Sequence, residues 1–333
     1  MLATLRIKTR LILLLVVVGL IPVTVVSLIM LERARTGLSD QAFAHLQTIS
    51  HTKKLQLERY IERIHADITV LAGSTHLSDA IDAFASTVND GKIDRVQYNY
   101  FESLEYGSSF RKFIEEFGYY DLMLITSGGD IVYSTRQESD LAQNITSGTL
   151  AKTLLGKAFQ QGLTEITVTD FELYAPSNDQ LMAFLLAPVQ LQDGETAGAV
   201  VLKMPHLQIN QIMLERTGMG ESGEAYLVGP DHVMRSDSHL DPVHHNVLAA
   251  LRNPGQGLVE TVSTSEALAG RSGKLLQDDY RGIPVLSSYT PVHWGDITYA
   301  LMAEIDAAEA FGTIIELRQL MIYTIVALFA LIL

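Results

Sequence analysis

The sequence contains no cysteine among its 333 residues, and it contains a single tryptophan, Trp294. Disulfide bonds, thiolate metal ligands and cysteine nucleophiles are therefore excluded. The Gly-x-Ser-x-Gly motif of serine hydrolases is also missing. The glycine-rich stretch "GMGESGEA" lacks the preceding strand and the lysine of a phosphate-binding loop. The sequence thus predicts no cofactor and no enzymatic activity for this chain.

Basic residues are scarce. The chain has 24 Lys and Arg against 38 Asp and Glu, which gives a formal net charge of −14, and the basic residues form no cluster. Because phosphate backbones are bound by basic surfaces, we expect no nucleic-acid partner. Hydrophobic residues make up 47% of the chain, which is enough for two domains with cores of their own.

Charge is absent from two long runs near the ends of the chain. Residues 11–31, "LILLLVVVGLIPVTVVSLIML", contain no charged residue, and a helix of this length crosses a hydrocarbon layer of roughly 30 Å. A cleavable signal peptide is the alternative, but its apolar region is usually shorter and ends at a small-residue cleavage site. Here the run is followed by "ERARTG". We therefore expect an uncleaved transmembrane helix.

Positive charges precede the first run, at Arg6, Lys8 and Arg10. By the positive-inside rule, residues 1–10 lie in the cytoplasm and the residues after the span lie outside. At the other end, residues 320–333 are uncharged but too few for a full crossing. We expect residues 313–333 to begin a second transmembrane helix, with the chain ending inside it and a cytoplasmic continuation beyond Leu333.

An amphipathic pattern follows the first span, and it predicts a long helix over residues 32–75. Charged residues fill the other faces of this helix, including Lys53, Glu58 and Arg63. The stripe either packs on its own domain or pairs with a second copy of the chain, and the sequence allows both. The apolar residues recur at three- and four-residue steps: Leu57, Tyr60, Ile61, Ile64, Ile68 and Leu71.

Two stretches of the middle region occur twice at nearly the same separation. "MLITSGGDIVYS", from Met123, matches "YLVGPDHVMRS", from Tyr226, and the stretches around Pro188 and Pro291 also match, at a separation of 103 residues (291 − 188). Two matches at one offset indicate a duplicated unit of roughly one hundred residues.

Each copy contains five strand candidates joined by short turns rich in Gly, Asp and Pro, which favour antiparallel pairing. We therefore expect an α+β fold in which each module is an antiparallel sheet with helices on one face. "HLQINQIMLERTG", residues 206–218, is expected to be the helix between the modules. The candidates are "DLMLI", "DIVYS", "EITVTDF", "LMAFLLAPV" and "GAVVLKM", then "AYLVG", "VMRSD", "LVETVS", "IPVLSSYTPV" and "ITYALMAEI".

The chain resembles the double Cache sensor region of bacterial receptors, in which a long helix and two tandem PAS-like modules stand between two transmembrane helices. The resemblance is carried by this order of elements and by "GMGESGEAYLVGPDHVMRSDS" and "VLSSYTPVHWGDITYALMAEIDAAEAF". It implies a membrane-distal module over residues 76–205 and a membrane-proximal module over residues 206–312. It also implies a homodimer through the long helix.

The same resemblance implies the function and location. Double Cache regions serve methyl-accepting chemotaxis receptors, sensor histidine kinases and diguanylate cyclases, and they usually bind a small molecule in the distal module. We expect a chemotaxis receptor, with the other two classes as alternatives. The resemblance places the chain in the bacterial inner membrane, with residues 32–312 periplasmic or extracellular.

Polar residues around the distal strands are the candidate ligand contacts, because a pocket needs an apolar wall and a few directed polar groups. The polar residues around these strands also include Tyr119 and Asp121, which we do not select as contacts. Amino-acid-binding relatives share an Arg-x-Trp pair and a later Asp, and this chain departs from that pattern, since its tryptophan is in the second module. We therefore expect a small-molecule ligand other than a free amino acid. The predicted contacts are Arg111, Tyr120, Tyr133, Ser134, Arg136, Asp170, Tyr174 and Ser177.

A metal site is the main rival interpretation. The loop "DHVMRSDSHLDPVHHN" combines imidazoles and carboxylates, which are ligands of zinc and other divalent metals. No helical two-histidine spacing directs them, so we favour a solvated acidic loop and predict no metal. A third possibility is a passive anchored domain, which two spans argue against. The candidate metal ligands are His239, Asp241, His244 and His245.

Overall fold

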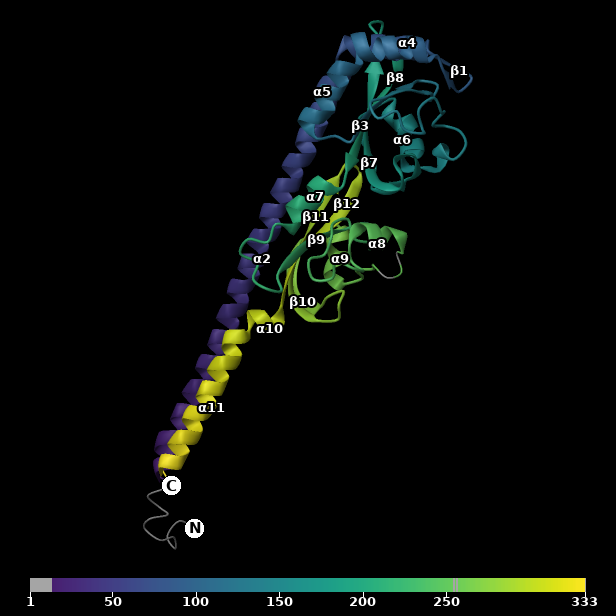
Figure 1. Ribbon diagram of the computed structural model, residues 1–333. Helices are drawn as coiled ribbons and strands as arrows, with labels where there is room; N and C mark the ends of the chain where they lie inside the picture. Colours follow the sequence, from purple (N-terminus) through teal and green to yellow (C-terminus); the bar gives the residue numbers. More distant parts are fainter. Residues whose placement is uncertain (1–13, 254, 256, 333) are drawn as a thin grey trace.

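A single long helix forms the spine of the molecule, and two sheet modules are stacked along one side of it (Figure 1). The computed structural model describes residues 14–253, 255 and 257–332. The predicted cytoplasmic segment 1–10, its three basic residues and the first residues of the predicted span at 11–31 lie outside the described residues.

The spine helix α2 spans Ile21–Ala72, and a π-helical turn over Val16–Leu20 precedes it. The predicted span and the predicted helix over 32–75 are therefore one continuous helix. Most of the predicted apolar stripe is buried against the strands of both modules, so the stripe packs on its own domain, which was the first of the two alternatives. Lys53 is an exception to the predicted polar face, because its Nζ donates to the carbonyls of Ile212 and Glu215. The buried residues of α2 are Leu46, Ser50, Lys53, Leu57, Tyr60, Ile64 and Ile68.

The distal module contains a six-stranded sheet in the order β4-β3-β8-β7-β5, with β6 also paired to β7. Helices α2 to α5 cover one face, and the segment from β4 to β6, with α6, covers the other (Figure 1). A small hairpin, β1 (Val88–Asn89) and β2 (Lys92–Ile93), lies at the distal end. The other elements are α3 (Thr75–Ala85), α4 (Arg95–Tyr100), α5 (Gly107–Phe117), β3 (Asp121–Thr126), β4 (Ile131–Ser134), α6 (Leu154–Gly162), β5 (Thr167–Val168), β6 (Glu172–Tyr174), β7 (Gln180–Gln190) and β8 (Thr196–Pro205).

The proximal module contains a four-stranded sheet in the order β10-β11-β12-β9. Helix α7 (Leu207–Leu214) connects the modules, within the predicted residues 206–218. Helices α8 and α9 lie on the side of the sheet away from α2 (Figure 1). The other elements are β9 (Glu224–Val228), α8 (Val247–Arg252), α9 (Val262–Leu268), β10 (Gly273–Asp278), β11 (Pro284–Trp294) and β12 (Ile297–Asp306).

The strand registers confirm the duplication. Pro188 of β7 lies opposite Ala199 of β8, and Pro291 of β11 lies opposite Ala300 of β12. Strands β3, β8 and β7 of the distal sheet therefore correspond to β9, β12 and β11 of the proximal sheet. All of the sheet pairings are antiparallel, as the short turns predicted.

Three strand predictions are wrong in whole or in part. "EITVTDF" forms only the two-residue strand β5, and "VMRSD" and "LVETVS" form isolated bridges, Val228 to Met234 and Val233 to Leu258. Near the first bridge, the side chain of Ser236 accepts the N–H of Leu227, and this bond replaces a ladder hydrogen bond. Side-chain oxygens that compete in this way shorten strands.

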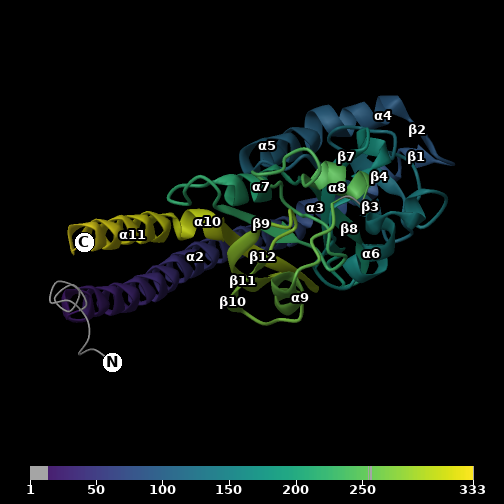
Figure 2. The same cartoon turned by 90° about the horizontal axis from the view of Figure 1, so that it is seen from below.

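The chain leaves β12 through α10 (Ala307–Ala310) and enters α11 (Gly312–Ile332). Helix α11 lies beside the N-terminal half of α2 in both views (Figures 1 and 2). By length and composition, the helices over Val16–Ala72 and Gly312–Ala330 are candidate membrane spans, and their apolar windows are almost fully exposed.

Candidate functional site

The candidate site lies in the distal module, on the face of the sheet turned away from α2. Its centre is Lys203 of β8, whose side chain has no exposed surface. In register, Lys203 lies between Asp121 of β3 and Phe184 of β7. The chain therefore places a buried lysine in the middle of a largely apolar sheet, beside Asp121.

Three carboxylates surround the ammonium group. The Nζ atom of Lys203 lies 2.9 Å from Glu138 Oε2, 2.9 Å from Asp140 Oδ2 and 3.3 Å from Asp121 Oδ2. It also lies 4.9 Å from the centre of the Tyr174 ring, within range of a cation–π interaction. Lys203 and the three carboxylates, Asp121, Glu138 and Asp140, are called the Lys203 cluster below.

Hydroxyl groups complete the surroundings of the carboxylates. Tyr120 donates to Glu138 Oε1 at 2.8 Å, and Ser177 donates to Glu138 Oε2 at 2.5 Å. Tyr174 donates to Asp140 Oδ2 at 2.9 Å, and Ser134 donates to Asp121 Oδ2 at 2.8 Å. These bonds fix the orientation of every carboxylate in the cluster.

The electrostatics of the cluster favour charged groups. Burial lowers the pKa of Lys203, but the carboxylates of Asp140 and Asp121 outweigh it, so the pKa is raised above its ordinary value. Burial likewise raises the pKa of Glu138, but Lys203 and Ser177 outweigh it and the pKa is lowered. The cluster thus holds three carboxylates on one ammonium, and Asp140 Oδ1 is buried with no hydrogen-bond partner among the described residues. Buried acceptors are nearly always hydrogen-bonded, so this oxygen is a position where a further donor would be stabilised.

Five of the eight predicted contacts come together here. Tyr120, Ser134, Tyr174 and Ser177 bond to the carboxylates of the cluster. Arg136 donates its backbone N–H to Asp121 and its Nε–H to the carbonyl of Tyr120.

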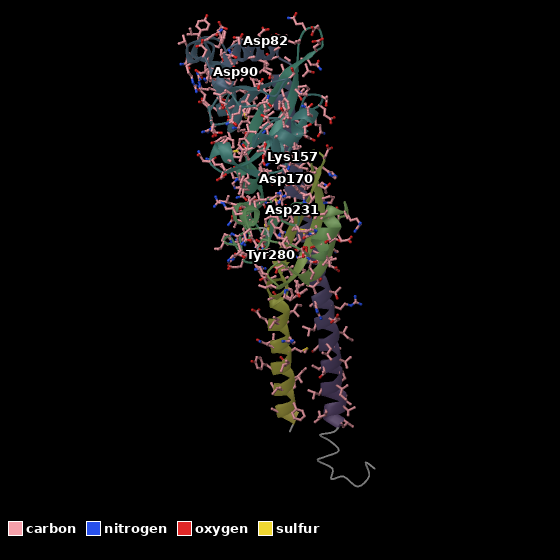
Figure 3. All side chains as sticks on the ribbon, turned by 90° about the vertical axis from the view of Figure 1, so that its right-hand side faces the viewer. Asp82, Asp90, Lys157, Asp170, Asp231 and Tyr280 are labelled. Carbon is pink, nitrogen blue, oxygen red and sulfur yellow. The ribbon has the colours of Figure 1, made fainter. Side chains whose placement is uncertain are left out.

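The other three predicted contacts lie elsewhere. Tyr133 is on the opposite face of the sheet, among Phe84, Tyr98 and Phe110, because neighbouring residues of a strand alternate in direction. Arg111 of α5 pairs with Glu102. Asp170 lies between the modules, where Figure 3 shows it between Lys157 and Asp231.

Asp170 belongs to a junction of the two modules. Its carboxylate accepts two hydrogen bonds from Arg235, at 2.8 and 2.7 Å, and one from the Tyr299 hydroxyl at 2.6 Å. The Trp294 indole donates to the Thr169 carbonyl at 2.8 Å. Next to this junction is a cavity of about 450 Å³ between α2, α6 and the β11–β12 turn. Asp170 therefore joins the modules and does not belong to the Lys203 cluster.

The sequence interpretation did not select Lys203, Glu138 or Asp140. The signal for Lys203 was present, since it is the one charged residue in the predicted strand "GAVVLKM". A buried lysine needs carboxylate partners. Glu138 and Asp140 come from the loop after β4, where the sequence pattern gives no direction for a side chain.

The candidate metal ligands do not converge. Asp241 pairs with His244 at 3.2 Å and with His245 at 2.7 Å, whereas His239 contacts Arg216. Within residues 14–253, 255 and 257–332, no three His, Asp or Glu side chains are arranged to hold a metal ion. Asp241 is thus the partner of His244 and His245, and His239 is directed elsewhere.

No protein-family model and no curated protein matches the sequence. Solved structures do match in fold. The ligand-binding domain of the Pseudomonas fluorescens chemoreceptor CtaA, in complex with L-isoleucine, has a TM-score of 0.52 at 12% identity, over 84% of this chain and 98% of that one. The Campylobacter jejuni chemoreceptor Tlp3 domain, with 4-methylisoleucine, has a TM-score of 0.54 at 11% identity, over 82% and 94%.

A histidine kinase domain is similar to the same degree. The sensor domain of Vibrio cholerae DctB has a TM-score of 0.51 at 16% identity, over 80% of this chain and 97% of that one. At these identities the likeness shows the fold alone, and it confirms the double Cache fold. Two of these structures hold amino acids, which runs against the prediction that a free amino acid is excluded.

Proposed function

We propose that residues 32–312 form the extracytoplasmic small-molecule sensor of a bacterial transmembrane receptor of the chemotaxis type. The observation that carries this proposal is that both ends of the two modules lead into candidate membrane helices: α2 runs unbroken from one, and β12 leads through the short helix α10 into α11, the other. A change in either module therefore has a covalent route to the membrane. The proposed sensor modules are residues 76–205 and 206–312, outside the bacterial inner membrane in which the chain is anchored, and the chain itself acts as a sensor and not as an enzyme.

The ligand that fits the Lys203 cluster is a small molecule with a protonated amine, amino acids included. The cluster has more carboxylates than cations, and Asp140 Oδ1 accepts no hydrogen bond from any residue that the structure describes. A ligand ammonium supplies both the missing charge and the missing donor. The amino acids held by the two chemoreceptor domains agree with this class.

Binding is expected to act by shifting a two-state equilibrium. A ligand that closes the distal module moves the β8–α7 connection and, through the junction, β12 and α11. A tenfold difference in affinity between the two states corresponds to about 1.4 kcal/mol, which is enough for a graded receptor response.

The test uses the full chain in lipid nanodiscs and measures its melting temperature with amino acids, simple amines and matching carboxylic acids without the amine. Ligands that bind the folded state raise the melting temperature. We expect amine-bearing compounds to do so, and Asp140→Asn to weaken the effect at least tenfold in apparent affinity. Asp179→Asn, on an exposed residue near the same loop, is the control. Equal stabilisation by the amine-free acids, or an unchanged response of Asp140→Asn, contradicts the proposal.

A histidine kinase sensor is the second candidate, because the DctB domain has the same fold. The reading frame downstream of codon 333 distinguishes the two. The proposed homodimer is tested separately: because the chain lacks cysteine, Ala66→Cys on the exposed face of α2 reports pairing by disulfide formation. Absence of crosslinking at every exposed position of α2 contradicts the dimer.

A further inference from the structure

The proximal module repeats the layout of the candidate site with one change of charge. Glu224 of β9 occupies the position of Asp121, and in register it lies opposite Glu304 of β12, which occupies the position of Lys203. Ser287 of β11 takes the position of Phe184. Two glutamates thus face each other where the distal module has an aspartate and a lysine. Glu224 and Glu304 are called the acid pair.

Both carboxylates of the acid pair are buried, at 2% exposure each. Glu224 is well bonded: it accepts the Tyr280 hydroxyl at 2.5 Å and the Ser238 hydroxyl at 2.9 Å. Among the described residues, the side chain of Glu304 accepts one well-formed hydrogen bond, from the Tyr226 hydroxyl at 2.7 Å on Oε2. Burial raises the pKa of Glu304, and the hydroxyls of Ser287 and Tyr226, which lie close to it, offset part of that rise. Its Oε1 is buried without a partner among the described residues, as is the hydroxyl of Ser287, the residue opposite it in register.

No cation neutralises the acid pair in the part of the chain that the structure describes. Arg281 is held by Asp279 and Asp306. His245 is held by Asp241, and its ring packs on Tyr280. Apart from Arg281 and His245, the titratable groups around Glu304 are carboxyls and phenols: Glu224 and Tyr226 from β9, Asp279 and Tyr280 from the turn before β11, and Asp241, which pairs with His245, from the loop after β9.

A buried carboxylate beside another carboxylate is costly, and a proton removes the cost. Protonation removes the charge of Glu304. A proton on Oε1 also makes that atom a hydrogen-bond donor, and the Ser287 hydroxyl oxygen can accept the hydrogen bond. Burial raises the pKa of Glu304 to about 7, and the carboxylates of Asp279 and Glu224 act in the same direction. The group therefore titrates in the range of ordinary external pH.

The acid pair also lies on the path to the membrane. Glu304 is two residues before the end of β12 at Asp306, after which the chain enters α10 and α11. Arg281 bonds Asp306 from the turn next to the acid pair. A change of charge at Glu304 acts directly on the strand that leads to the second candidate span.

We propose that the acid pair is a proton-binding site, and that the proximal module senses external pH as a second input, below the ligand site of the distal module. The proton site stands on the geometry of the proximal sheet alone. Its role as an input rests on the proposed receptor function.

The experiment measures the melting temperature of the full chain in nanodiscs from pH 5 to 8.5. Because the pKa of Glu304 is higher in the folded protein than in the unfolded chain, its stabilising contribution is complete below pH 4.5, the ordinary glutamate value, and is lost as the pH rises through 7. The unfolding equilibrium constant then increases up to tenfold per pH unit within that window. We expect Glu304→Gln, a neutral isostere, to remove this dependence.

Glu260→Gln, on an exposed residue of the same module, is the matched control and is expected to keep the wild-type pH dependence. Comparison with Glu304→Gln separates Glu304 from the histidines, which both proteins retain. A second readout is the infrared carbonyl band of a protonated buried carboxyl group, which is expected to titrate near pH 7 in the wild type. Equal pH dependence of the wild type and Glu304→Gln, or no such band above pH 5, overturns the proposal.

The two sites are distinguishable. Asp140→Asn is expected to lose the response to amines and keep the response to pH, and Glu304→Gln is expected to do the reverse. If the receptor function fails while the proton site stands, the pH dependence of stability persists, but disulfide crosslinking between single cysteines in α2 and α11 is independent of pH. Crosslinking that changes with pH in the wild type and not in Glu304→Gln supports the sensing role.

Discussion

In the distal module, a lysine faces an aspartate across two neighbouring strands, whereas in the proximal module a glutamate faces a glutamate at the same place. The strand pairing is equivalent at both places. The residue at one position of the middle strand therefore decides whether the neighbouring carboxylate is paired with a cation of its own module. The distal position holds Lys203 with three carboxylates around it, whereas the acid pair of the proximal module has no lysine or arginine paired with it among the described residues.

The difference also separates two kinds of response. In the proposed ligand site, a cluster with its own ammonium exchanges contacts with an amine-bearing ligand, so its selectivity depends on shape and hydrogen bonds. In the proposed proton site, an acid pair without a cation binds the smallest cation, the proton, and so responds to pH. A duplicated module can in this way supply two inputs to one pair of membrane helices.

The largest predicted effects come from exchanging the charges of Lys203 and Glu304, the equivalent residues of the two middle strands. Lys203→Glu leaves four buried carboxylates without a cation, and we expect it to lower the free energy of unfolding by about 3–5 kcal/mol or more. Glu304→Lys gives Glu224 a cation, and the pairing offsets part of the roughly 1–3 kcal/mol cost of a longer side chain. Urea unfolding of the full chain measures both.

Lys152→Glu, on an exposed lysine of the distal module, is the control and is expected to change stability by less than about 0.5 kcal/mol. Glu304→Lys is also expected to remove the pH dependence of stability. The comparison is contradicted if Glu304→Lys destabilises the protein as much as Lys203→Glu does.

The junction around Asp170 joins the two modules without belonging to the Lys203 cluster or to the acid pair. Changing it is therefore expected to affect stability without affecting amine binding. Asp170→Asn weakens the two hydrogen bonds from Arg235 and is expected to cost about 2 kcal/mol. Asp231→Asn is the control: Asp231 also accepts from Arg235, at 3.0 Å, but it is half exposed, so we expect less than about 1 kcal/mol. Urea unfolding measures the costs, and amine titration is expected to show unchanged affinity in Asp170→Asn. Loss of amine binding in that variant restores Asp170 as a ligand contact.

The sequence predicted the fold well, because its signals are local and repeated. The matching stretches around Pro188 and Pro291 gave the correct correspondence of strands, and the short turns gave the pairing. Ser134, the last residue of β4, and Arg136, two positions after it, contact the Lys203 cluster. Tyr133 precedes Ser134 on the strand and so points to the opposite face, and its role as a ligand contact stays a prediction.

Two other parts of the candidate site depend on contacts that the sequence pattern does not encode. The predicted ligand contact Asp170 pairs with Arg235 of the other module, and docking of two modules leaves no local signal in the sequence. The importance of Lys203 depends on Glu138 and Asp140, which a loop brings back over the sheet. The equivalence of Lys203 and Glu304 emerged only from the strand registers, because the matched stretches differ in length.

The smallest predicted effect concerns the one hydrogen bond that Glu304 accepts. Tyr226→Phe removes the hydroxyl that donates to Glu304 Oε2 and so removes a group that stabilises the charged form. We expect the pKa of Glu304 to rise by about one pH unit, which corresponds to about 1.4 kcal/mol. The infrared carboxyl band measures its midpoint. Tyr289→Phe, in the same apolar core, is the control and is expected to leave the midpoint unchanged. Equal shifts in both variants attribute the effect to core packing, whereas a shift in Tyr226→Phe alone shows that hydrogen bonding to the acid pair sets the pH at which the proximal module responds.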